Sequence, residues 1–103
     1  NSTRFLVIGR DDIPPSGDDK TSIIVSVNNA PGALYLLLEP FQTHGVDLTR
    51  VETRPARSGT WSYVFFIDFV GHQDDEKVTA ALALVRKRVA NLRILGSYPS
   101  AVL

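Results

Sequence analysis

Two short polar segments contain the residues whose types and spacing suit ligand binding. The first runs from Asn29 to Leu34 and reads Asn-Ala-Pro-Gly-Ala-Leu; the second runs from Glu52 to Pro55 and reads Glu-Thr-Arg-Pro. A helix that begins in the first segment would offer unpaired amides and a positive dipole end to a carboxylate. The charged side chains of the second segment can pair with an ammonium or a carboxylate. Together these groups predict a binding site for a small zwitterion such as an amino acid.

Each segment also has an ordinary structural interpretation. Pro31 and Gly32 are typical of a tight turn between a strand and a helix, and Pro55 is typical of the end of a strand. For either segment taken alone, the structural interpretation is the stronger one. One helix and a short reversal separate the two segments, so folding can bring them close together, and that closeness is what favours a site.

Composition limits the classes of function. The chain has 103 residues, of which 11 are basic and 11 acidic, so its formal net charge is zero. A zero net charge removes the electrostatic basis for binding nucleic acid or an anionic membrane surface. The chain has no cysteine, which excludes disulfides and cysteine zinc sites and is consistent with the cytoplasm. His44 and His72 lack acids at ligand spacing and are expected to be solvated, so neither a metal nor a cofactor is expected.

The chain divides into parts by composition. Thr3–Ile8 reads as a strand, and the following residues to Lys20 are polar and contain two adjacent prolines. We expect residues 1–9 to be the end of a preceding domain, residues 10–20 to be a linker and residues 21–103 to form one domain. Because the sequence begins at an asparagine and contains no methionine, we expect it to be a fragment of a longer polypeptide.

Hydrophobic periodicity predicts six elements after the linker. They are a strand at 21–27, a helix with Leu34, Leu37, Leu38 and Phe41 on its apolar face, strands at 46–54 and 61–70, a helix capped by Asp74 or Asp75, and a strand at 91–96. Val46 and Leu48 share a parity that Val51 does not, which predicts a bulge or a change of face. This order predicts an α+β fold, the ferredoxin-like βαββαβ sandwich, in which a four-stranded antiparallel sheet carries two helices on one face.

The two polar segments and their flanks resemble the regulatory ACT domain of prephenate dehydratases. That family carries Gly-Ala-Leu at the start of the first helix and Glu-Ser-Arg-Pro after the second strand. Here Gly32–Tyr35 reads Gly-Ala-Leu-Tyr and the second segment reads Glu-Thr-Arg-Pro, with Thr53 in place of the usual serine. Ala30 stands where family members often carry a charged or polar residue.

The resemblance extends over most of the chain. It continues through Trp61–Asp68 and Gly96–Pro99, and Thr3–Phe5 is similar to the Thr-Arg-Phe motif that ends the family's catalytic domain. By this resemblance residues 1–9 are a remnant of the catalytic domain and residues 21–103 are the ACT domain. Thr3, Arg4 and Phe5 would then be remnants of a catalytic motif in a fragment that is not itself catalytic.

The resemblance implies binding of L-phenylalanine at an interface between two ACT domains. The chain would form a homodimer or a higher homo-oligomer and would control a missing catalytic domain that converts prephenate to phenylpyruvate. The effector-binding residues implied are Asn29, Pro31, Gly32, Ala33, Leu34, Asp47, Leu48, Glu52, Thr53, Arg54 and Pro55. The helix amides are expected to hold the carboxylate of the ligand, and polar groups near Asn29, Asp47 and Glu52 its ammonium.

Two other classes of function compete with this hypothesis. A structural dimerisation module would pair the sheet with another chain and bind no ligand. The aromatic strand that begins at Trp61 also suggests a nucleic-acid binder of the RNA-recognition type, but residues 58–65 lack that motif's basic-glycine-aromatic order.

Overall fold

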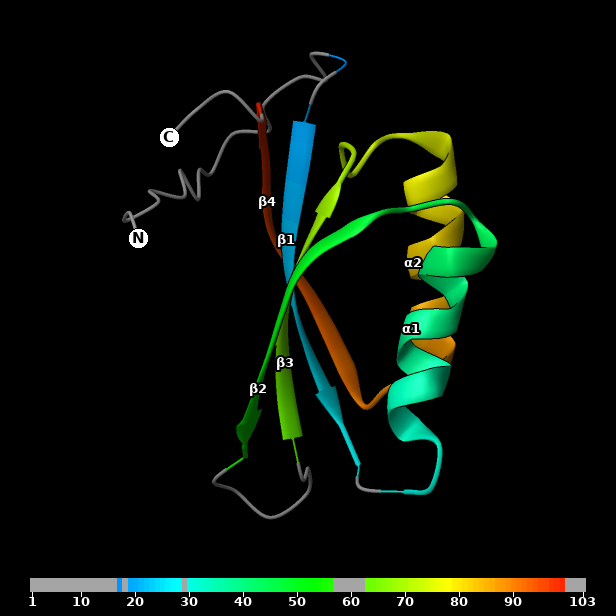
Figure 1. Cartoon of the computed structure of the whole chain (residues 1–103), viewed down its shortest axis with the longest axis vertical. Helices are drawn as coiled ribbons and strands as arrows, with labels where there is room; N and C mark the ends of the chain where they lie inside the picture. The colour runs from blue at the N-terminus through cyan, green and yellow to red at the C-terminus, as the bar shows by residue number, and fades with distance from the viewer. Residues whose placement is uncertain (1–16, 18, 29, 57–62, 100–103) are drawn as a thin grey trace.

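The predicted sandwich of one sheet and two helices is confirmed. The computed structural model describes residues 17, 19–28, 30–56 and 63–99. Its elements are β1 (Asp19–Val27), α1 (Ala33–Thr43), β2 (Leu48–Pro55), β3 (Tyr63–Val70), α2 (Glu76–Arg88) and β4 (Asn91–Pro99). The strands pair antiparallel in the order β2-β3-β1-β4, and both helices cover one face of the sheet (Figure 1). The β2–β3 register shifts between Leu48 and Arg50, which confirms the predicted bulge.

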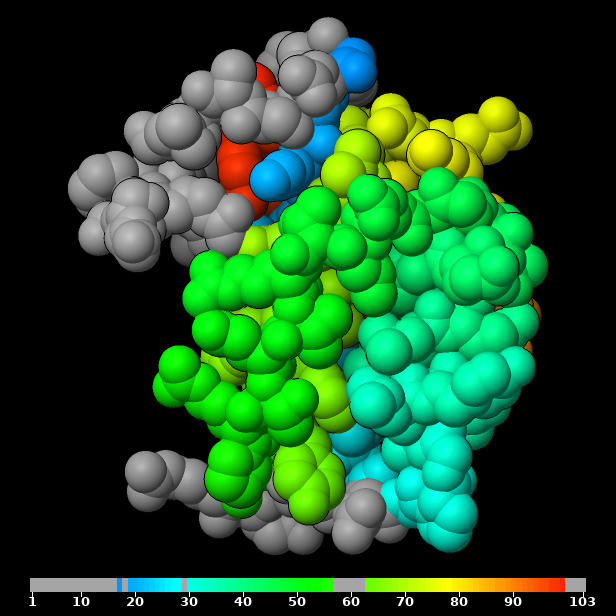
Figure 2. Space-filling model, viewed as in Figure 1, coloured from blue at the N-terminus to red at the C-terminus, as the bar shows by residue number. Residues whose placement is uncertain are grey.

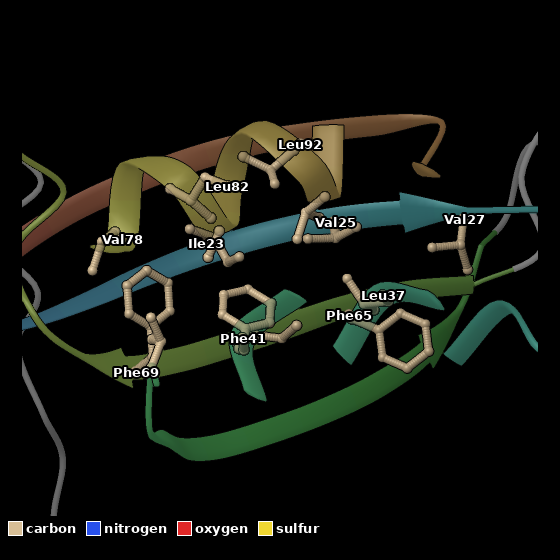
Figure 3. Close-up of a cluster of buried hydrophobic side chains, with 14 residues drawn as sticks. Ile23, Val25, Val27, Leu37, Phe41, Phe65, Phe69, Val78, Leu82 and Leu92 are labelled. Carbon is tan, nitrogen blue, oxygen red and sulfur yellow. The ribbon is translucent and has the colours of Figure 1, made fainter. Parts of the chain in front are cut away.

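The core forms where alternate side chains of the inner strands meet the helices. Ile23 and Val25 of β1 and Ile67 and Phe69 of β3 are fully buried, and Phe41 of α1 packs onto them (Figure 3). The rings of Phe41 and Phe69 are 5.5 Å apart between centroids. Complete burial of one such side chain stabilises a fold by about 1.5 to 3 kcal/mol. This layer therefore fixes α1 against the sheet.

Helix α2 buries one stripe of side chains, whereas its start differs from the expectation. Val78, Ala81, Leu82 and Val85 are its buried residues. Asp75 is the N-cap residue, but its carboxylate accepts the His72 backbone N–H at 2.9 Å instead of an amide of the helix. The carboxylate therefore stabilises the turn before α2 and not the first turn of the helix itself.

The expectation that His72 is solvated was wrong. Its side chain is fully buried, and its Nδ1 accepts the backbone N–H of Asp74 at 3.0 Å. The turn containing His72 folds back onto the end of the sheet, where Thr21 Oγ1 donates to Gly71 O at 2.6 Å and lies 2.7 Å from Ser97 Oγ. Composition marked this segment only as a polar turn, and the sequence gives no sign that the sheet end buries it.

Pro40 interrupts the hydrogen bonding of α1. It has no N–H for the carbonyl of Leu36, the residue four positions earlier. Arg88, in the last turn of α2, provides the missing donor, because its Nη1 lies 3.1 Å from Leu36 O and 2.7 Å from Glu39 Oε1. Glu39 also accepts the Thr43 hydroxyl at 2.8 Å. The Arg88 guanidinium thus connects α2 to α1 at the carbonyl that Pro40 leaves without a helical donor.

Replacing Arg88 with methionine should lower the free energy of unfolding by about 1 kcal/mol, because the Leu36 carbonyl loses its donor. In a Pro40→Ala background, the N–H of Ala at position 40 can donate a hydrogen bond to Leu36 O. The Arg88→Met change should then lower the free energy of unfolding by a smaller amount. Urea unfolding of the four variants measures this difference as a double-mutant cycle. Equal costs in the two backgrounds would contradict the role assigned to Arg88.

Hydrogen bonds from Arg88 and then from Thr43 lower the pKa of Glu39 below its ordinary value. The ionised carboxylate therefore stabilises the fold at pH values above the ordinary carboxyl pKa. This contribution to stability is lost as the pH falls through the lowered pKa. The melting temperature should drop less between about pH 5 and about pH 3 in Glu39→Gln than in the unaltered chain. An identical drop in both proteins would show that the pair has no role in acid stability.

Candidate functional site

The first helix begins at a left-handed turn. Gly32 is its N-cap residue with φ of 79°, a backbone conformation that glycine adopts without steric cost. The N–H of Leu36 donates to Gly32 O at 2.9 Å, which is the first hydrogen bond of the helix. The amides of Leu34 and Tyr35 precede that bond and have no intrahelical acceptor. They lie at the positive end of the helix dipole and can bind an anion.

A pocket of about 230 Å³ lies beside this helix start. It is lined by Val27, Asn28, Ala33, Leu34, Thr53, Tyr63 and Phe65. Ala33 and Leu34 belong to the first polar segment of the sequence and Thr53 to the second, so the structure brings the two segments together. Figure 2 shows α1 and β2 on the same surface of the molecule, with part of β3 between them. The mainly apolar lining suits an apolar side chain below the polar helix end.

Apolar side chains remain exposed around this pocket. Leu34, which we expected on the buried stripe of the helix, is 49% exposed, and Tyr35 next to it is 67% exposed. Val51 on β2 and Tyr63 on β3 are also exposed. β2 is an edge strand, which leaves one side of its backbone without a partner in the sheet. Exposed apolar groups beside an open edge are typical of a surface that meets another chain.

Glu52 and Arg54 lie on the face of the sheet away from the helices. Side chains alternate along a strand, so Thr53 on the helix side places its two neighbours on the other side. Glu52 Oε2 accepts a hydrogen bond from Arg50 Nη2 at 2.7 Å, and this bond lowers the pKa of Glu52 below its ordinary value. The guanidinium of Arg54 lies 5.6 Å from the centroid of the Phe66 ring. Within one chain, the structure does not bring these two charged residues to the helix start.

Asp47 and Leu48 lie at the opposite end of α1 from the pocket. The carbonyl of Asp47 accepts the Val70 N–H at 2.9 Å, and Leu48 pairs with Phe69. A helix of 11 residues is about 16 Å long, so this end is about that far from the helix start. These two residues therefore do not line the pocket of their own chain.

The remaining sequence candidates have the following positions. Pro31 is an exposed turn residue that precedes the helix, and Pro55 is exposed at the end of β2. Asn29, together with Thr3, Arg4 and Phe5, lies outside the described residues.

Sequence reasoning missed part of the pocket wall. Asn28, Tyr63 and Phe65 were not among the candidate residues, although Phe65 is both a buried core residue and part of the pocket wall. Phe65 pairs with Thr53 across β2 and β3, so the two side chains must share a face of the sheet. Because side chains alternate between the two faces along a strand, the sequence already placed Thr53 on the opposite face from Glu52 and Arg54. The same alternation, applied to the pairing of β2 with β3, places Thr53 on the face of the aromatic residue Phe65.

Comparison with known proteins gives the family. A sequence model of the ACT domain matches residues 21–83. The chain belongs to the ACT domain family. This ACT domain is 60% identical over 103 residues to a bifunctional chorismate mutase/prephenate dehydratase of Pseudomonas aeruginosa. The match covers 100% of this chain and 28% of the relative. The chain thus spans less than a third of the length of that curated relative.

Two solved structures share the fold of this ACT domain. Prephenate dehydratase from Arthrobacter aurescens in complex with L-Phe is 37% identical with a TM-score of 0.83, over 90% of this chain and 31% of that one. GqqA, described as a novel type of quorum quenching acylase, is 31% identical with a TM-score of 0.83, over 90% of this chain and 34% of that one. Neither of the two helices that the structure describes is long and apolar enough to cross a membrane.

Replacing Gly32 with alanine should destabilise the ACT domain by about 1 kcal/mol, because an L-residue is strained at a φ of 79°. An added Cβ meets no atom within 4 Å, so the cost is conformational and not steric. Gly32→Asn should cost less, because asparagine tolerates the left-handed region. Thermal unfolding of both variants is the measurement, and alanine proving as stable as glycine would contradict the assignment.

Proposed function

We propose that this chain is the regulatory domain of a prephenate dehydratase and binds L-phenylalanine in the pocket at the start of α1. Binding there would control the conversion of prephenate to phenylpyruvate by a catalytic domain of the same polypeptide, in the cytoplasm. The observation that carries the proposal is the meeting of Ala33, Leu34 and Thr53 around one apolar pocket beside free helix amides. The complex of the 37% identical Arthrobacter aurescens protein with L-Phe supports the choice of ligand.

The pocket offers a separate group for each part of an amino acid. The N–H groups of Leu34 and Tyr35 would hold the carboxylate at the positive end of the helix. Phe65 and Tyr63 would contact the aromatic ring, for which offset or edge-to-face packing is favourable. About 12 non-hydrogen atoms contributing about 0.5 kcal/mol each give roughly 6 kcal/mol, which corresponds to a Kd of tens of micromolar. That affinity suits a sensor of a metabolite that accumulates.

A second copy of the chain would complete the site. A two-fold axis beside α1 and β2 would place the same surface of both chains in contact and would bury Leu34 and Val51, which are exposed in one chain. It would also bring Asp47 and Leu48 of the second copy toward the helix start of the first. Asp47 of the second copy would then pair with the ammonium group of the ligand, together with Asn29 in the turn before α1 of the first copy.

The other candidate residues would shape the site without lining the pocket of their own chain. Asn29, Pro31 and Gly32 would set the turn that aims the helix amides. Glu52, Arg54 and Pro55 would hold the end of β2 in place from its other face and thereby position Thr53. A ligand that bridges two copies favours one arrangement of the dimer, and a coupling of about 1 to 3 kcal/mol changes the linked equilibrium roughly 5- to 150-fold.

Replacing Ala33 with methionine should fill the pocket and weaken L-phenylalanine binding at least tenfold, because methionine is helix-compatible but occupies the space of the ring. Calorimetric titration of the chain with L-phenylalanine measures the affinity. Ala83→Met makes the same change at an exposed position of α2 and should bind like the unaltered chain.

The outcomes of this titration separate the competing functions. Heat from the unaltered chain and from Ala83→Met, without heat from Ala33→Met, supports the sensor and its location. If no variant gives heat of binding at concentrations where the chain is dimeric, the proposal of a phenylalanine sensor is contradicted. The structural dimerisation module is then the remaining hypothesis. Full binding by Ala33→Met would show that the ligand lies elsewhere.

Replacing Val51 with aspartate should shift the chain toward the monomer, because the carboxylate would be buried between two copies. Sedimentation velocity gives the oligomeric state, and the same variant should bind L-phenylalanine more weakly. Ala83→Asp is the control, because it adds the same charge at an exposed position of α2 away from the pocket. A dimer of unchanged stability in Val51→Asp would place the interface on another surface.

A further inference from the structure

The sheet face away from the helices carries a row of side chains with opposite charges at its two ends. Both described helices pack on the other face (Figure 1), so we name this one the open face. Glu52 of β2 pairs with Phe66 of β3. Phe66 also pairs with Ile24 of β1, and Ile24 pairs with Arg93 of β4. Directly paired residues share a face, and Ile67 next to Phe66 is in the core, so the row points away from the helices.

The middle of this row is apolar and incompletely covered. Phe66 and Ile24 are partly exposed, although they lie on the two inner strands of the sheet. A strand that is apolar on both faces is typical of a sheet with both faces covered. At the end of the row Arg93 is exposed, and its side chain makes no ion pair or hydrogen bond within the part of the chain that the structure describes. The Arg93 guanidinium can therefore still bind a carboxylate.

The acidic end of the row is partly neutralised within the chain. Arg50 Nη2 donates to Glu52 Oε2 at 2.7 Å, and both side chains are about half exposed. This hydrogen bond is the largest of the causes that raise the pKa of Arg50, and the charge of Asp68 adds a smaller contribution. Arg50 thus serves two carboxylates, which leaves this cluster with a net negative charge. The second oxygen of Glu52, Oε1, bonds to no described residue and can accept another donor.

We propose that the open face binds a second copy of this chain across a two-fold axis that runs parallel to the strands, between β3 and β1. This rotation keeps each row at its level and reverses the order of the strands, so β2 of one copy lies over β4 of the other. Glu52 then faces Arg93 of the second copy, and Phe66 faces Ile24, each twice. Packed sheets lie about 10 Å apart, a gap that a glutamate and an arginine can bridge together.

The remaining charges of the open face meet no like charge in this arrangement. The same rotation, applied to the other rows, gives these opposite residues: Arg54 over Asn91, Arg50 over Gly96, Asp68 over Ser22 and Lys20 over Val70. A two-fold axis perpendicular to the strands is less favourable, because it would place each strand over itself. Phe66 would then face Asp68 of the second copy, or it would face Phe66 while the two Glu52 carboxylates oppose each other.

The size of the open face predicts a weak contact. Four strands about 4.8 Å apart, each with about eight residues, give a face of roughly 500 Å². Two such faces bury about 1,000 Å² in total, which is near the lower limit for a specific interface. We therefore expect this contact at high protein concentration. It leaves the surface of α1 and the outer edge of β2 free, so it does not depend on the proposed phenylalanine site.

Charge reversal at the two ends of the row tests the pairing. Glu52→Arg gives the row a positive charge at both ends, and Arg93→Glu gives it a negative charge at both ends. Each variant alone should self-associate at least tenfold more weakly than the unaltered chain in sedimentation equilibrium up to millimolar concentration. An equal mixture of the two should regain the association, because each introduced residue then faces its opposite charge.

The controls make the same changes of charge on exposed positions of α2. Glu76→Arg, Lys87→Glu and their mixture should each associate like the unaltered chain. Unchanged association of Glu52→Arg and Arg93→Glu would overturn the proposal. Association that is lost in both variants and not regained in the mixture would also overturn it, because the two residues would then not face each other.

A second series remains informative if Glu52→Arg does not fold. Arg93 lies on β4, at the opposite edge of the sheet from β2, so its variants leave the contact proposed beside α1 unchanged. Association should fall from the unaltered chain to Arg93→Gln and further to Arg93→Glu, and high salt should reduce these differences. Equal association of all three proteins would contradict a second copy on the open face.

Discussion

The alternation of side chains across the sheet is the constraint on which the rest of this structure depends. In β1 and β3, one parity places Ile23, Val25, Ile67 and Phe69 against the helices and forms a dry core. The other parity places Ser22 and Asp68 on the opposite face, where they bond to each other. A shift of register by one residue would exchange the two sets, burying the polar pair in the core and exposing the aromatic layer.

The same alternation divides the second polar segment between two surfaces. Thr53 reaches the pocket at the start of α1, whereas Glu52 and Arg54 belong to the other face with Arg50. The pocket is therefore more apolar than the sequence of the segment suggests. Its polar character comes from the backbone, because Gly32 turns the chain so that the first amides of α1 point outward. A carboxylate is recognised by such amides without any basic side chain.

Sequence reasoning predicted the order of elements, the bulge in β2 and the meeting of the two segments, because each depends on local periodicity or on short connections. It did not predict the burial of His72 or the hydrogen bond from Arg88 to Leu36 O, because these join residues far apart in the chain. The left-handed conformation of Gly32 was also missed, since Pro-Gly is compatible with several turns. The exposure of Leu34 depends on what lies beside the helix, which its apolar spacing does not reveal.

The central claim is that L-phenylalanine binds between the start of α1 and the end of β2. Amide chemical shifts of the isotope-labelled chain, recorded during titration with L-phenylalanine, test it most directly. The account predicts that Leu34, Tyr35 and Thr53 shift most and saturate together, while the Ser22 and Asp68 amides in the centre of the sheet shift least. Saturable shifts centred on Ser22 and Asp68, or no shifts at millimolar ligand, would contradict it.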